Sequence, residues 1–166
     1  MNILMALSQL EVTGAEVYAT TVGNELTRRG HNVFYVSDTL TKPTLGAVFK
    51  LRFNKRSILR RFWHVFYLIY LIRKHHIQLV HAHSRASGWS SYVACKLTGT
   101  PMITTVHGRQ PVHASRKAFH ALGYRAVAVC EDIASQIIDN LGVDPAMVQV
   151  LRNGIETDRF QPVPAP

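Results

Sequence analysis

The sequence PMITTVHGR, residues 101–109, decides how this chain folds. Residues 101–106 carry no charge; four are apolar and two are β-branched threonines, a composition typical of a strand in the middle of a parallel sheet. The strand runs directly into His107, Gly108 and Arg109. Because open α/β sheets bind ligands at the carboxyl ends of their strands, we expect these three residues at the ligand-binding edge.

Apolar stretches elsewhere in the chain alternate between strand-like and helix-like spacing. Strands are expected at 2–7, 31–37, 78–82, 101–106, 125–130 and 147–151, and helices at 15–29, 57–75, 85–97, 115–122 and 132–141. For residues 38–54 a loop, an edge strand or both remain open. Strands that alternate with helices predict an α/β fold with a doubly wound, mainly parallel, Rossmann-like sheet.

The composition is that of one globular domain with an unusual distribution of charge. The 166 residues are 47% hydrophobic and 17% charged, which excludes a disordered or fibrous chain. Lys and Arg number 19 against 10 Asp and Glu, and 15 of the 19 lie between residues 39 and 130, where no acidic residue occurs. This regional charge predicts a negatively charged partner: phosphate, nucleotide, anionic lipid or nucleic acid.

Cysteine and histidine usage argues against a disulfide framework and a structural metal. The two cysteines, Cys95 and Cys130, form no CxxC pattern, which fits a reducing, cytoplasmic setting. The first residues lack a basic region and are expected to form a strand, not a signal peptide. His81 and His83 alternate along one predicted strand, but no third ligand is near in sequence, so no metal is expected.

Two features could contact a ligand. Gly14 precedes a predicted helix whose N-terminal N–H groups could approach a phosphate, although the segment lacks GxGxxG and P-loop patterns and Gly14 could be a turn glycine. His107, at a strand end beside a glycine, could donate a hydrogen bond to a hydroxyl or to a developing negative charge. Alternatively, it could be a satisfied core residue.

Six motifs occur together in a specific order. They are the glycine loop with Gly14, Ala15 and Glu16, then RRGHNV at 28–33, LVHAHS at 79–84, TTVHG at 104–108, AVCEDI at 128–133 and VLRNGIETDRF at 150–160. Across the whole chain they resemble the N-terminal domain of the family 4 GT-B glycosyltransferases, which transfer a sugar from a nucleotide sugar with retention at the anomeric carbon. Departures are Thr13 before Gly14, Gln78 in place of the usual aspartate and Cys130 in place of the usual serine.

The resemblance implies a division into domains and a set of site residues. Residues 1–152 would form the Rossmann-like, acceptor-side half, 153–166 would begin the interdomain linker with Asn153 and Gly154 at the hinge, and the donor-binding domain would be absent, leaving the fragment inactive. His107 would contact the transferred sugar. The implied substrate-binding residues are Gly14, Ala15, Glu16, His83, Ser84, Gly108, Arg109 and Cys130. No cofactor or metal is expected: the donor substrate would be a nucleotide sugar, and the acceptor a glycan or lipid-linked molecule of cell-envelope polysaccharide or lipopolysaccharide synthesis.

A basic, aromatic segment leaves two interpretations open. The run FWHVFYLIYLI at 62–72 follows the basic residues Lys50, Arg52, Lys55, Arg56, Arg60 and Arg61. It could lie on anionic lipid at the inner face of the cytoplasmic membrane, or it could be a core helix with solvated ends. A core helix is favoured for 65–72. An alternative function for the whole chain is a non-catalytic module that binds anionic lipid or glycan; nucleic acid is not expected, because no recognition motif occurs.

Overall fold

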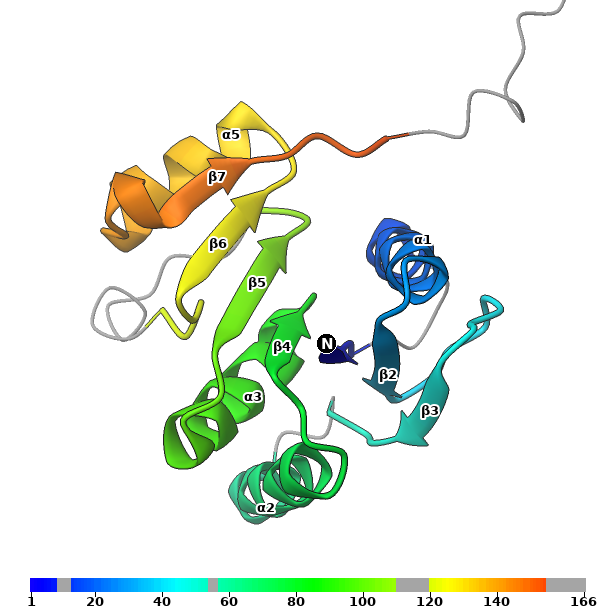
Figure 1. The fold of residues 1–166 in the computed structure, drawn as a ribbon. Coiled ribbons are helices and arrows are strands. Elements are labelled where there is room, and N and C mark those ends of the chain that lie inside the picture. Colours follow the sequence, from blue (N-terminus) through cyan, green and yellow to red (C-terminus); the bar gives the residue numbers. More distant parts are fainter. Residues whose placement is uncertain (9–12, 54–56, 110–119, 155–166) are drawn as a thin grey trace, which may run out of the picture.

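Seven parallel strands form a single sheet in the computed structural model, which describes residues 1–8, 13–53, 57–109 and 120–154. The strand order is β3-β2-β1-β4-β5-β6-β7 (Figure 1). The strands are β1 (Asn2–Ala6), β2 (Asn32–Ser37), β3 (Ala47–Lys50), β4 (Leu79–Ala82), β5 (Met102–Val106), β6 (Arg125–Ala128) and β7 (Val148–Val150). All registered pairs are parallel, which confirms the doubly wound α/β fold.

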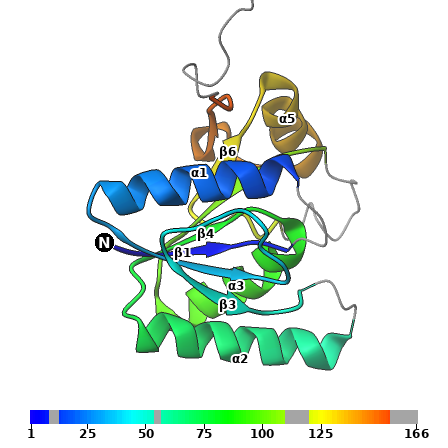
Figure 2. The ribbon, with the colours of Figure 1, turned by 90° about the vertical axis from the view of Figure 1, so that its right-hand side faces the viewer.

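Helices cover both faces of the sheet (Figures 1 and 2). They are α1 (Gly14–Arg28), α2 (Ile58–Lys74), α3 (Arg85–Thr98) and α5 (Glu131–Ser135), with a π-helical turn η1 (Gln136–Asn140) and a 3-10 turn η2 (Pro145–Met147). α1 lies on one face, and α2, α3 and α5 lie on the other. The strand order reverses between β1 and β4, so the helices that follow these two strands diverge to opposite faces. This switch point is where such sheets bind ligands.

The core is built from alternating side chains of the strands. In β1, Leu4 and Ala6 pack in the cluster that contains α2 and α3 side chains, whereas Ile3 and Met5 pack with Ala19 of α1. Alternation follows from the two-residue period of a strand and shows that both faces are covered.

The inner face of α2 belongs to this core. Val65, Leu68, Leu71 and Ile72 are buried, as expected for a core helix over 65–72.

The outer face of α2 is also apolar, but it is exposed. Five large side chains recur at helical spacing on this face: Leu59 is 81% exposed, Phe62 54%, Trp63 66%, Phe66 63% and Tyr70 50%. A solvated helix face is normally polar, so this surface is unusual for a globular domain. Among the helices that the structure describes, none has the length and apolarity required to cross a bilayer.

Residues 38–53 form both a loop and the edge strand β3, which is one of the alternatives left open by the sequence. Three other elements differ from the sequence prediction. The helix expected at 132–141 divides into α5 and the π-turn η1, because apolar spacing specifies the buried face and not the hydrogen-bond pattern. β6 ends at Ala128, so Cys130 is the N-cap of α5 and does not end the strand. The helix expected at 115–122 lies mainly outside the described residues, and 120–122 are not helical.

Candidate functional site

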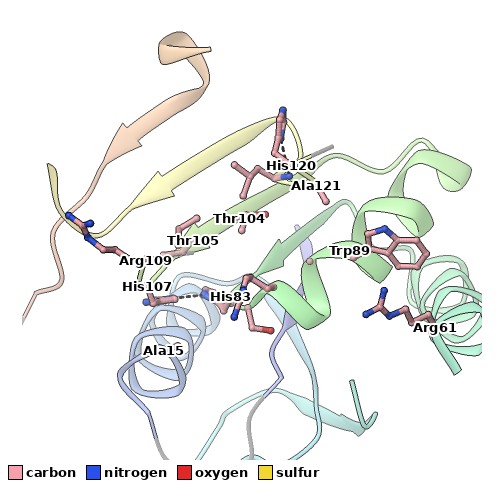
Figure 3. Close-up of a pocket in the computed structure, with 16 residues that line it drawn as sticks. Ala15, Arg61, His83, Trp89, Thr104, Thr105, His107, Arg109, His120 and Ala121 are labelled. Atoms are coloured by element: carbon pink, nitrogen blue, oxygen red, sulfur yellow. Dashed lines mark hydrogen bonds between the residues drawn. The ribbon is translucent and has the colours of Figure 1, made fainter. Parts of the chain in front are cut away.

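A cavity of about 560 Å³ opens at the carboxyl edge of the sheet, across the switch point (Figure 3). Its walls come from the start of α1, from the ends of β4 and β5, and from α2 and α3. The predicted site residues in its lining are Ala15, His83, Ser84, His107, Gly108 and Arg109. The volume is typical of small-molecule sites. The tertiary structure therefore brings together three predicted segments that are far apart in sequence.

Three histidines, His81, His83 and His107, lie close together near α1. His83 Nδ1 lies 3.3 Å from His107 Nε2, and the rings of His81 and His83 lie 4.0 Å apart between centroids. His81 Nε2 lies 2.8 Å from Thr105 Oγ1. Tyr18 of α1 presents its ring edge-on to His107, with centroids 5.1 Å apart. These contacts hold His107 in a defined orientation at the cavity wall.

The cluster is held in its neutral form. Burial lowers the pKa of His107 to about 4, and burial together with the neighbouring His107 lowers the pKa of His81 to about 4. Burial, with His81 and His107 nearby, also lowers the pKa of His83 well below its ordinary value. Three adjacent imidazoles cannot all be charged at this distance, because like charges in a poorly solvated site repel. His107 therefore meets a ligand as a neutral imidazole.

The hydrogen-bond partners of His83 select its tautomer. His83 Nε2 lies 3.5 Å from Met5 Sδ, and a thioether sulfur has no hydrogen to donate. His83 Nε2 therefore carries the hydrogen, and its Nδ1 accepts from His107 Nε2–H. In a neutral His107 the remaining nitrogen, Nδ1, then holds a lone pair and can accept a hydrogen bond from a hydroxyl group.

Arg109 lines the cavity and is also engaged outside it. Its guanidinium donates to both carboxylate oxygens of Asp132, in the first turn of α5, with Nε 2.9 Å from Oδ2. The pair is solvent-exposed, and it raises the pKa of Arg109 and lowers that of Asp132. The charge of Arg109 is thus already compensated by a carboxylate. Its contact with a substrate stays a prediction.

Glu16 lies away from the cavity lining, in a structural position. It is 1% exposed, and its Oε1 accepts hydrogen bonds from Thr41 N at 2.6 Å, Thr41 Oγ1 at 2.9 Å and Lys42 N at 2.9 Å. The carboxylate therefore ties α1 to the loop between β2 and β3. A role for Glu16 in substrate binding stays a prediction.

The other predicted residues are distributed around the edge. Gly14 is exposed at the start of α1, and Ser84 caps α3 by accepting from Ser87 N. Cys130 is half-buried before α5 and is not in the cavity lining. Asn153 and Gly154 are exposed beyond β7, and the residues after them lie outside the described part. Of the basic residues, Lys50, Arg52, Arg60 and Arg61 are exposed, whereas Lys55 and Arg56 are not described.

Sequence reasoning missed the opposite end of the cavity. Arg61 of α2 and Trp89 of α3 lie at this end, with Arg61 Cζ 5.8 Å from the centre of the Trp89 ring, and Arg85 at the start of α3 also lines the cavity. The sequence assigns Arg61 only to a basic surface, and Arg85 and Trp89 belong to no motif. The one available signal was the absence of acidic residues from 39 to 130. Within the described ranges, no group of three or more His, Cys, Asp or Glu side chains is arranged so that it could hold a metal ion.

The fold and the site together define a class of protein: a Rossmann-like domain with a small-molecule cavity at the carboxyl edge of its sheet. The Glycosyltransferase Family 4 model matches residues 12–159, and the chain belongs to that family. This confirms the resemblance inferred from the six motifs.

Individual proteins are similar to this chain over different lengths. A UDP-Gal:α-D-GlcNAc-diphosphoundecaprenol α-1,3-galactosyltransferase of Escherichia coli is 27% identical over 104 residues, which are 55% of this chain and 27% of that protein. A glycosyltransferase structure from Rickettsia africae superposes with a TM-score of 0.83 at 25% identity, covering 95% of this chain and 44% of that one. Anabaena HepE, in complex with UDP-glucose, has a TM-score of 0.77 at 14% identity, covering 99% of this chain and 47% of that one. The chain therefore spans less than half the length of each of these proteins.

Proposed function

We propose that this chain is the acceptor-binding half of a retaining glycosyltransferase that moves a sugar from a nucleotide sugar to a glycan or lipid-linked acceptor. The observation that carries the proposal is the cavity at the switch point, with the neutral His107 in its wall. The product would enter cell-envelope polysaccharide or lipopolysaccharide. The diphosphoundecaprenol acceptor in the name of the Escherichia coli relative supports a lipid-linked acceptor here.

The role proposed for His107 is to bind and orient the transferred sugar. Its Nδ1 lone pair accepts a hydrogen bond from a sugar hydroxyl, while His83 holds the ring from the other side. Gly108 has no side chain to obstruct the approach of the sugar. A neutral acceptor fixes geometry without adding charge, so the expected contribution is positioning of the reacting carbon.

The donor site and most of the charge neutralisation are assigned to a second domain. We expect the nucleotide sugar to bind across the cleft between two domains, with no resident cofactor or metal. Asn153 and Gly154 are placed at the hinge. On this proposal the 166-residue chain alone does not turn over a nucleotide sugar.

Activity of the complete gene product tests the proposal. Nucleotide release is measured with a panel of nucleotide sugars, with and without EDTA, for wild type, for His107→Ala and for His76→Asn, which changes an exposed histidine outside the cavity. We expect His107→Ala to lower kcat by about 100-fold, of the order expected when a reacting group is misplaced, and His76→Asn to have no effect. Turnover by the 166 residues alone, an inverted anomeric product, or full activity of His107→Ala contradicts it.

The outer face of α2 is proposed to rest on an anionic membrane at the cytoplasmic side. The exposed aromatic residues Phe62, Trp63 and Phe66 lie beside the exposed cations Arg60 and Arg61, a combination that suits the headgroup region of a bilayer. No acidic residue in 39–130 opposes this attraction. The protein would then work as a peripheral enzyme whose cavity lies close to lipid.

Vesicle binding tests the membrane contact. Sedimentation with phosphatidylglycerol vesicles is compared for wild type, for Phe62→Ser/Phe66→Ser and for Leu97→Ser, which changes a similarly exposed apolar residue on α3. We expect binding to anionic vesicles but not to phosphatidylcholine, a loss of at least tenfold in the α2 variant, and no loss in the α3 variant. Equal binding by all three proteins contradicts the assignment. Vesicle binding without transfer by the complete gene product supports the alternative, a non-catalytic lipid- or glycan-binding module.

A further inference from the structure

The end of the cavity opposite His107 is positively charged. No described carboxylate forms an ion pair that compensates this charge. Arg61 lies at this end, and Arg85 also lines the cavity; neither forms an ion pair with any side chain that the structure describes. None of the described residues that line the cavity is Asp or Glu. Arg109, at the His107 end, differs because Asp132 holds it. Two unpaired guanidinium groups beside one cavity indicate an anionic ligand.

The aromatic ring of Trp89 defines the geometry of this end. Arg61 Cζ lies 5.8 Å from the ring centre, within the range of a cation–π contact, which restrains a long side chain without using its N–H donors. Figure 3 shows Arg61 and Trp89 together on the far side of the cavity from His107 and Arg109. The N–H groups of Arg61 thus remain available for the planar, paired hydrogen bonds that guanidinium groups make with phosphate.

The N-terminus of α3 adds to the positive potential. Arg85 is the first residue of this 14-residue helix, and Ser84 and Gly88 of the same turn also line the cavity. A helix N-terminus favours an anion, and the two arginines provide the independent charge. Gly88 leaves the helix surface open on this side, since a side chain there would meet only Ala121 O at 3.9 Å among the described atoms.

We propose that Arg61, Arg85 and Trp89 bind the phosphate or diphosphate group of an anionic acceptor, with the sugar-transfer end of the acceptor directed toward His107. The assignment of this phosphate to the acceptor rests on the proposed function, whereas anion binding at the two arginines does not. Arg61 belongs to α2, whose outer face is apolar, so a phosphate attached to a lipid would reach the cavity from that side.

Tryptophan fluorescence tests the site directly. The chain has two tryptophans, so Trp63→Phe leaves Trp89 as the reporter. This variant is titrated with inorganic pyrophosphate, with farnesyl diphosphate and with UDP. We expect all three diphosphates to change Trp89 fluorescence and farnesyl diphosphate to bind most tightly. Tighter binding of UDP than of farnesyl diphosphate overturns the assignment to the acceptor.

Charge variants with a matched control separate the site from general attraction. In the same background, Arg61→Gln and Arg85→Gln are each expected to raise the Kd for farnesyl diphosphate at least tenfold. Lys96→Gln removes an exposed cation from the distal end of α3, outside this cavity, and is expected to leave the Kd unchanged. All three residues are exposed, so thermal midpoints should match. Equal Kd values for wild type and both arginine variants, or an equal effect of Lys96→Gln, overturn the proposal.

The proposed function and this site fail in different experiments. Arginine-dependent diphosphate binding by a protein that transfers no sugar contradicts the function and leaves the site intact. Sugar transfer that is unaffected by Arg61→Gln and Arg85→Gln, with unchanged KM for a phosphorylated acceptor, contradicts the site and leaves the function intact.

Discussion

His83 Nδ1 lies 3.3 Å from His107 Nε2, and this contact joins the ends of two neighbouring strands, β4 and β5. The opposite nitrogen of His83 faces Met5 of β1 at 3.5 Å. Three adjacent strands therefore determine which nitrogen of His107 is free for a ligand. A single strand end could place a histidine at the sheet edge, but it could not select the tautomer.

Replacement of His83 by Phe is expected to impair positioning of His107. The ring volume remains, but His107 Nε2 loses its partner, which costs about 1 kcal/mol or more of orientation energy. We expect kcat of the complete gene product to fall roughly tenfold with little change in the KM for acceptor. Steady-state kinetics measure both constants. His83→Gln, which keeps a hydrogen-bonding group, should restore part of the activity; a variant with wild-type kcat after His83→Phe contradicts the role.

The histidine cluster predicts a loss of stability in acid. The folded state holds His81 and His107 with pKa values near 4, below the ordinary value of 6.5, so the unfolded chain binds more protons between these values. The stability is fully present above about pH 6.5 and is lost as the pH falls toward 4. Urea unfolding at pH 7, 5.5 and 4.5 measures the slope.

A variant of His81 isolates one contribution to this slope. His81→Gln retains a partner for Thr105 but cannot take up the proton, so its free energy of unfolding should decline less between pH 7 and 4, by up to about 3 kcal/mol. An identical decline in wild type and His81→Gln contradicts the assignment.

Glu16 is predicted to act in stability. Glu16→Ala leaves the N–H groups of Thr41 and Lys42 without their acceptor and removes a buried, hydrogen-bonded carboxylate. We expect the free energy of unfolding to fall by about 3 kcal/mol. Glu25→Ala, which removes an exposed carboxylate of the same helix paired with Arg29, should cost clearly less, because exposed ion pairs contribute little to stability. If Glu16→Ala is as stable as wild type but inactive, Glu16 belongs to the substrate site.

Gly123 is expected to be intolerant of a side chain. Its φ is +82°, and an added Cβ would collide with the backbone carbonyl of Met102, which accepts from Tyr124 N at 2.7 Å. Gly99 has a similar φ of +72°, but open space lies around it among the described atoms. We therefore expect Gly99→Ala to cost about 1 kcal/mol for backbone strain alone, and Gly123→Ala clearly more. Equal thermal midpoints for the two variants contradict the close approach.

The regular elements of the fold were predictable because local patterns specify them. Charge-free runs identify β1, β4 and β5, and Gly30 and Gly99 follow the ends of α1 and α3. The interior of the helix after β6 was less predictable. There the apolar residues Ile133, Ile137 and Leu141 all reach the core, but their spacing fits both α- and π-helical hydrogen bonding.

The candidate site was predictable only at one end. His83, Ser84 and His107 follow strands, and the carboxyl ends of parallel strands meet at one edge. Arg61 and Trp89 were not predictable, because they come from helices whose crossing brings them together. The burial of Glu16 could not be predicted from the sequence either, because its hydrogen-bond partners belong to a loop 25 residues away.

The sequence by itself determined the alternation of strands and helices, the regional positive charge and the family, because these depend on residue types and their order along the chain. Only the tertiary structure decided which arginines have a carboxylate partner, which nitrogen of His107 is free for a ligand, and that the aromatic face of α2 is exposed. Each of these depends on distances between residues that are remote in the chain, and such distances are set by how helices cross the sheet and how strands order within it.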